Sequence, residues 1–250
     1  FAFNSNKLVM LVVSLAVGMA ETALPMLARA KEIGDRENIG DQIQFAFKLL
    51  AFVMVPASLG MAAVAHPLYI LFYNTNDATN GTLILQFASF TAIALGLYMV
   101  VLAIYQGLNE LSFTVKVLGL ILILKLILQV PLTIWLQGAG PLMATVLAFA
   151  VGLIISIRRL SVLYAIEWAP FNFSLMVILF WGLVMYAVVA LLTNTLTLFV
   201  PDTKMAQLVV TVVVGLVGAG IYGVAMLKTH VGESVLGQRA ATIAHKLHLK

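Results

Sequence analysis

The residue best suited to do chemistry is a lysine inside an apolar segment. Lys125 stands within the run GLILILKLILQVP, and Gln129 follows four residues later. Residues four apart share one face of a helix, and a charge at the centre of a bilayer costs roughly 2.5–3.5 kcal/mol on insertion scales. The pair therefore indicates either a cationic site for an anionic substrate or headgroup, or a structural lysine paired with a carboxylate or carbonyl of a neighbouring helix.

A carboxylate in an earlier segment is a second candidate. Glu21 belongs to a stripe formed by Ser14, Gly18, Glu21 and Pro25, whose spacing places all four on one face of a helix. We interpret Glu21 either as a proton or cation site in a transport path, or as a carboxylate that water of a nearby loop solvates.

Other segments carry polar or small side chains at spacings of interest. Gln86, Tyr105 and Gln106 are candidates for lining a cavity, although tyrosines near helix ends also serve as interfacial anchors. A further run has Gly215, Ala219 and Gly223 at four-residue spacing, which predicts close packing against another helix.

Several kinds of enzyme site are missing from the sequence. There is no cysteine, so disulfides, thiolate catalysis and cysteine metal sites are excluded. The four histidines do not follow an H-E-x-x-H spacing, and no G-x-x-x-x-G-K-[ST] phosphate loop occurs. We therefore predict no metal, no cofactor and no enzymatic activity, and we expect a role in transport or assembly.

The elements that must position these residues are apolar helices. Hydrophobic residues make up 62% of the chain and charged residues 10%, whereas a soluble domain is about half apolar and about a quarter charged. Apolar runs of about twenty residues recur, and each can cross a bilayer only as a helix. We predict an all-α, polytopic transmembrane bundle over residues 1–228 and a basic cytoplasmic tail over 229–250. About seven spans are expected, at 8–28, 45–73, 82–107, 113–136, 141–157, 175–200 and 206–227.

The distribution of lysine and arginine predicts the orientation. One side of the predicted bundle has Lys7 and Lys204. The other side collects most of the remaining cations: Arg29, Lys31, Arg36, Arg158, Arg159, Lys228, Arg239, Lys246 and Lys250. The positive-inside rule places a charged loop at 29–41 and the C-terminus in the cytoplasm of a cell-membrane protein, and the N-terminus outside. The chain begins with Phe1 instead of Met, which we interpret as a sign of a fragment.

Five motifs, taken in order, resemble a family of transporters. They are ALPMLARAKEIGD, LAFVMVPASLGMAAVAHPLYILFY, AIYQGLNE, LKLILQVPL and GAGPLMATVLAFAVGLIIS. Their order and spacing resemble polysaccharide-export and lipid II flippases of the MOP superfamily, and most of all the spore-cortex and peptidoglycan precursor flippases of Gram-positive bacteria. The resemblance covers about residues 3–159 well and the last two helices loosely.

The resemblance implies two helical bundles that face each other across a central cavity, usually with 14 helices in all. This chain would correspond to the last seven, and the N-terminal partner bundle would be missing. In the family a cationic cavity residue begins the helix that matches 8–28, and Lys7 is the positive charge in that neighbourhood here. The resemblance thus implies substrate binding by Lys125 and Lys7 and rocking of the bundles about a midplane cavity. We add Gln129 to the substrate-binding residues because it shares a helix face with Lys125, and we hypothesise that Glu21 takes part in ion coupling.

The leading hypothesis is the flipping of a lipid-linked oligosaccharide or peptidoglycan precursor across the cytoplasmic membrane by alternating access. The expected partners are this substrate, membrane lipids and the N-terminal bundle. Nucleic acid is not expected, because cytoplasmic cations account for the net charge of +4. Two alternatives stay open: a multidrug/cation antiporter of the same superfamily, and a non-transporting membrane fragment or scaffold.

Overall fold

The computed structural model describes residues 2–34, 36–73, 78–164, 166, 168–201 and 203–236. Within this part the chain is built from helices: α1 (Ala2–Ile33), α2 (Arg36–Ala63), α3 (Ala65–Phe72), α4 (Ala78–Gly107), α5 (Leu111–Leu136), the 3-10 turn η1 (Gln137–Ala139), α6 (Gly140–Tyr164), α7 (Ala169–Phe199), α8 (Lys204–Leu227) and α9 (His230–Leu236). The prediction of an all-α polytopic bundle is confirmed.

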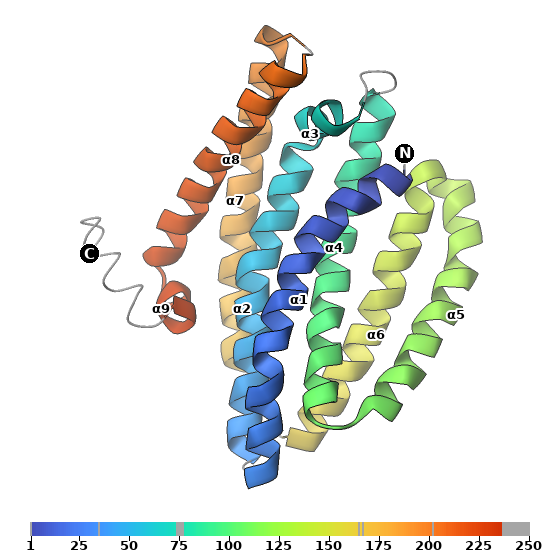
Figure 1. The fold of residues 1–250 in the computed structure, drawn as a ribbon, viewed down its shortest axis with the longest axis vertical. Helices are drawn as coiled ribbons and strands as arrows, with labels where there is room; N and C mark the ends of the chain where they lie inside the picture. Colours follow the sequence, from blue (N-terminus) through green and yellow to red (C-terminus); the bar gives the residue numbers. More distant parts are fainter. Residues whose placement is uncertain are drawn as a thin grey trace.

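The long helices have the length and composition of membrane spans. Five stretches of the described chain qualify: 38–63, 78–107, 111–164, 171–199 and 204–227. The stretch 111–164 contains two helices, α5 and α6, which fold back on each other (Figure 1). α1 adds a shorter apolar segment, Lys7–Met19. The long helices alternate in direction (Figure 1), as expected of a chain that crosses a membrane repeatedly.

The helix expected at 45–73 is interrupted, and this part of the prediction is wrong. α2 ends at Ala63, and α3 begins at Ala65 after Val64, whose φ is −100° and ψ 22°. The cause is Pro67, which has no N–H to donate to the carbonyl of Ala63, as an unbroken helix would require. α3 consequently lies across the end of the bundle (Figure 1).

The charged loop expected at 29–41 is mostly helical. α1 continues to Ile33, and α2 begins at Arg36. Gly34 has a φ of +76°, and its N–H donates to the carbonyl oxygen of Lys31 at 3.0 Å. A glycine in the left-handed conformation is a common helix terminator, so a very short connection reverses the chain here.

The tail expected at 229–250 is described only at its beginning. That segment forms α9, which folds back against α8 and α2. Residues 237–250, with the predicted basic positions Arg239, Lys246 and Lys250, lie outside the described residues.

α2 is shared by the two packed regions of the molecule. On one side it packs with α1, α4 and α6 in a core that includes Phe47, Tyr98 and Tyr105. On the other side it packs with α7 and α8 around Met185, Val214 and Tyr222. α5 stands at the edge and packs mainly on α6 (Figure 1).

Candidate functional site

The lysine predicted to bind substrate lies near the middle of the edge helix, α5. Lys125 and Gln129 are both half-buried. The buried neighbours Val117 and Ile121 face α6, where Gly152 permits close approach: a Cβ at Gly152 would lie 2.4 Å from the Cδ1 atom of Ile121. Lys125 is therefore held at the flank of the α5–α6 contact.

The side chain of Lys125 is not committed to a partner within the described part of the chain, where no hydrogen bond or ion pair involves it. The Oγ1 atom of Thr133 donates a hydrogen bond to the carbonyl oxygen of Gln129 at 2.6 Å. This bond uses the backbone of Gln129 and not its side-chain amide. The structural alternative, a lysine paired with a neighbouring helix, thus finds no partner among the described residues.

The polar stripe predicted on the first helix is a surface feature of α1. Ser14, Gly18, Glu21 and Pro25 are all exposed, as is Lys7 further toward the N-terminus. α1 packs on α4 and α2, whereas α5 packs mainly on α6. Within the described chain, Lys7 and Glu21 therefore do not join Lys125 and Gln129 in one contact group.

The three candidates on α4 lie in different surroundings. Gln86 is half-buried and Gln106 is exposed. Tyr105 is fully buried, its hydroxyl donates to the carbonyl oxygen of Ser156 at 3.0 Å, and its ring lies 5.1 Å from that of Phe113. Tyr105 thus joins α4 to α6 and α5 as part of the packed interior of this structure.

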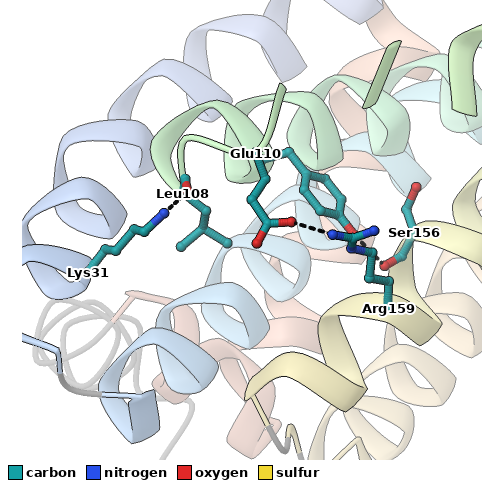
Figure 2. Close-up of polar contacts among 6 residues, drawn as sticks. Lys31, Leu108, Glu110, Ser156 and Arg159 are labelled. Carbon is teal, nitrogen blue, oxygen red and sulfur yellow. Dashed lines mark hydrogen bonds and ion pairs between the residues drawn. The ribbon is translucent and has the colours of Figure 1, made fainter. Parts of the chain in front are cut away.

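A cluster of charged contacts surrounds the turn between α4 and α5 (Figure 2). The Nη2 atom of Arg159, on α6, lies 2.9 Å from the Oε2 atom of Glu110, and the guanidinium is 4.1 Å from the ring centroid of Phe113. Lys31, on α1, donates to the carbonyl oxygen of Leu108. Figure 2 shows these side chains reaching the turn from two different helices. The turn is therefore fixed from both sides.

An apolar groove of about 450 Å³ lies between α2, α7 and α8. We call it the α8 groove. α2 contributes residues from Phe52 to Met61, Val64 follows at the break before α3, and α8 contributes residues from Thr211 to Tyr222. The hydroxyl of Tyr222 donates to the carbonyl oxygen of Phe52 at 2.9 Å, and that of Thr211 donates to the carbonyl oxygen of Gln207 at 2.8 Å. With both hydroxyls engaged, the groove offers hydrocarbon surface.

Small residues of α8 shape this groove in a way that sequence reasoning missed. Gly215 and Ala219, predicted to pack against a helix, line the groove, and a Cβ at Gly215 or Gly223 would meet no described atom within 4 Å. The close contact is made by Gly218, where a Cβ would lie 2.7 Å from Val189 of α7. The sequence signal for this contact was Gly218 itself, a small residue directly before Ala219.

The described residues include no group of three or more His, Asp or Glu side chains that could hold a metal ion. The candidate features in this part of the chain are the half-buried Lys125 and Gln129 of α5, the exposed Glu21 of α1 and the α8 groove.

The chain is similar to known proteins over most of its length. Residues 2–227 match the family model of the lipid II flippase MurJ. The chain is 29% identical over 241 residues to the lipid II flippase MurJ of Bacillus subtilis (strain 168), with 94% of this chain and 44% of that protein covered. A solved structure of lipid II flippase MurJ in an inward closed conformation shares the fold, with a TM-score of 0.67 and 17% identity, over 87% of this chain and 45% of that one. The chain thus spans less than half the length of the curated relative that it matches.

Proposed function

Because the chain belongs to the MurJ family of lipid II flippases, we propose that it takes part in moving a lipid-linked peptidoglycan precursor across the cell membrane. The observation that carries this proposal is the family match, which runs through every long helix from residue 2 to residue 227. A flippase is a transporter, so the family agrees with the prediction of a membrane transport protein and not an enzyme. The family match does not favour the antiporter alternative.

The α8 groove supports binding of the hydrocarbon part of such a substrate. A polyprenyl tail has no hydrogen-bonding groups, and an apolar surface with its hydroxyls already paired matches that property. Gly215 and Ala219 keep the groove open by the small size of their side chains. We infer that the tail lies along α8 while the headgroup crosses the membrane.

The polar candidates support binding of the charged part. A pyrophosphate is anionic, and Lys125 is a half-buried cation without a described partner. In our proposal Lys125 and Gln129 bind the pyrophosphate, and Lys7, which lies apart from them on α1, binds the headgroup at another step of transport. Glu21 couples transport to an ion. Gln86 and Gln106 would line the path, and a second helical bundle opposite α1 would complete the cavity for alternating access.

The charges also support an orientation. Lys31, Arg158 and Arg159 lie at the end of the bundle where α1 ends and α5 begins. At the opposite end Lys7 lies in the second turn of α1 and Lys204 begins α8. We infer that the first end, and the C-terminus with it, faces the cytoplasm. In a full-length protein whose other cysteines have been replaced, Ser112→Cys and Thr79→Cys each place one thiol at one of the two ends; these 250 residues contain no cysteine. An impermeant maleimide applied to intact cells should label only Thr79→Cys, and labelling of Ser112→Cys alone would reverse the orientation.

The proposed function is tested by depleting the full-length protein that carries this chain and measuring polyprenyl-linked precursors in each leaflet. Accumulation on the inner leaflet is the expected result. Unchanged pools with new sensitivity to cationic dyes would instead support an antiporter, and unchanged pools without sensitivity a scaffold.

The α8 groove provides a sharper test with a matched control. Ala219→Leu fills the groove, whereas Gly220→Leu adds the same side chain one residue away, where a Cβ meets no described atom within 4 Å. Transport should fall in Ala219→Leu only. Equal transport by the two variants would remove the groove from the mechanism.

A further inference from the structure

A second apolar cavity lies on the other side of the place where α7 approaches α2. Its volume is about 270 Å³, and α2, α4, α6 and α7 form its walls. The approach occurs at Gly182, where a Cβ would lie 3.1 Å from side-chain atoms of Leu59 and Val55. α7 residues before Gly182, from Phe171 to Leu179, line this small cavity, whereas Met185 and Val189 after it line the α8 groove. The two volumes are therefore distinct.

The small cavity is suited to hydrocarbon. All eleven residues that line it are apolar, among them Ala51, Leu97, Ile157 and Leu175. A polar ligand would lose its hydrogen bonds to water there without replacement. Leu179, on its wall, is 40% exposed, so a chain from the surrounding membrane can reach the cavity.

One end of the small cavity has the character of a membrane interface. Phe47 and Phe171 line the cavity, and their ring centroids lie 5.8 Å and 5.5 Å from that of Trp168. The indole N–H of Trp168 donates to the Oγ atom of Ser161 at 2.6 Å. Tryptophan with an apolar body and a bonded N–H is typical of the headgroup level of a bilayer.

Two cations stand at this same end. Lys48 is half-buried on α2, and Ala51 and Val55, which line the small cavity, follow it by three and seven residues on the same helix face. Among the described residues, Lys48 forms no hydrogen bond or ion pair. Arg158 is exposed and directly follows Ile157 of the cavity wall. A long basic side chain beside apolar surface extends its charge toward headgroups.

From these observations we propose that the small cavity binds one acyl chain of an anionic phospholipid, and that Lys48 holds the headgroup phosphate at the aromatic end. The apolar lining selects the chain, and the cation without a described partner selects the charge. This site is separate from the α8 groove, and it does not depend on the function proposed above.

Photolabelling tests the proposal. The full-length protein is placed in phosphatidylcholine nanodiscs with a trace of a lipid that carries a diazirine in its hydrocarbon tail, and labelled peptides are identified by mass spectrometry. Three probes are compared: phosphatidylglycerol, phosphatidylcholine and a polyprenyl phosphate. Phosphatidylglycerol should label the segments around Leu97, Ile157 and Leu175 about fivefold more than phosphatidylcholine, the ratio that corresponds to ~1 kcal/mol for one lysine near anionic lipid.

Variants locate the selectivity. Lys48→Ala should reduce labelling by phosphatidylglycerol to the level of phosphatidylcholine, whereas Lys116→Ala, which removes an exposed cation of α5, should leave it unchanged. Ala51→Leu should abolish labelling by filling the cavity. If Ala51→Leu does not fold, the comparison of Lys48→Ala with Lys116→Ala decides alone.

Three results would overturn the proposal. The first is equal labelling by the two phospholipids in the unsubstituted protein. The second is unchanged preference for phosphatidylglycerol in Lys48→Ala. The third is labelling of the same segments by the polyprenyl phosphate in place of the phospholipid, which would make the cavity part of the substrate path. Unchanged precursor pools after depletion would refute the proposed function and would affect none of these readouts, so the two proposals can fail separately.

Discussion

Replacing Gly218 by alanine should weaken the contact between α7 and α8. The new Cβ would lie 2.7 Å from the Cγ2 atom of Val189 and 3.6 Å from the Cγ atom of Met185. Val189 is 2% exposed, and a β-branched side chain has one strongly preferred rotamer in a helix. The overlap must therefore be relieved by moving the two helices apart.

The size of the effect follows from two opposing contributions. Overpacking of a buried contact costs about 1–3 kcal/mol, and alanine is favoured over glycine within a helix by about 1 kcal/mol. The net loss for Gly218→Ala is then about 0–2 kcal/mol. Gly220→Ala is the matched control, because its Cβ would meet no described atom within 4 Å. Gly220→Ala changes only the intrinsic helix propensity, so its free energy of unfolding should rise by up to about 1 kcal/mol.

The quantity to measure is the difference between these two variants of one helix. Unfolding in mixed micelles titrated with sodium dodecyl sulfate, followed by circular dichroism, gives the free energy of unfolding of each. Gly218→Ala should be less stable than Gly220→Ala by about 1–3 kcal/mol. Equal free energies of unfolding would refute the reasoning, because they would show that Val189 does not oppose a side chain at Gly218.

Three further predictions concern polar groups. Lys125→Gln should lower transport of the lipid-linked precursor in reconstituted vesicles, whereas Lys116→Gln should not; equal rates would exclude Lys125 from binding the pyrophosphate. The Arg159–Glu110 ion pair is partly exposed, at 43% and 28% for the two side chains. A double-mutant cycle of unfolding free energies with alanine should therefore give a coupling energy of about 0.2–1 kcal/mol that falls as salt is added. A coupling energy above this range, or one insensitive to salt, would contradict the exposed geometry. Tyr222→Phe should lose about 0.5–1.5 kcal/mol of stability with its interhelical hydrogen bond, and unfolding at the unsubstituted midpoint would show that the bond contributes nothing.

The helical bundle could be predicted because a chain that crosses lipid must satisfy its backbone hydrogen bonds internally, as a helix does. Apolar runs long enough to cross a bilayer identify the helices without knowledge of their neighbours. The break after Ala63 was harder to predict, because the apolar composition continues through it and only Pro67 signals the change. Likewise the expected loop at 29–41 was inferred from charge, yet charged residues continue a helix well, and it is Gly34 that ends it.

The candidate site was predictable in its residues and not in its geometry. Lys125 was identified because a lysine in an apolar run is costly. The contact of Arg159 with Glu110 joins residues 49 apart, and that of Lys31 with Leu108 joins residues 77 apart, so no local pattern encodes them. From the sequence alone, the hydroxyl of Tyr105 could either line a cavity or bond to another helix. The structure shows the second role, because this hydroxyl donates to the carbonyl oxygen of Ser156.

The close approach of α7 to α2 at Gly182 has a mechanical consequence. The small cavity and the α8 groove lie before and after this point along α7. If α7 tilted as a rigid helix about this contact, its two halves would move in opposite directions relative to α2, so one volume would widen as the other narrowed. Gly182, which has no side chain, lies at the contact that separates the two volumes.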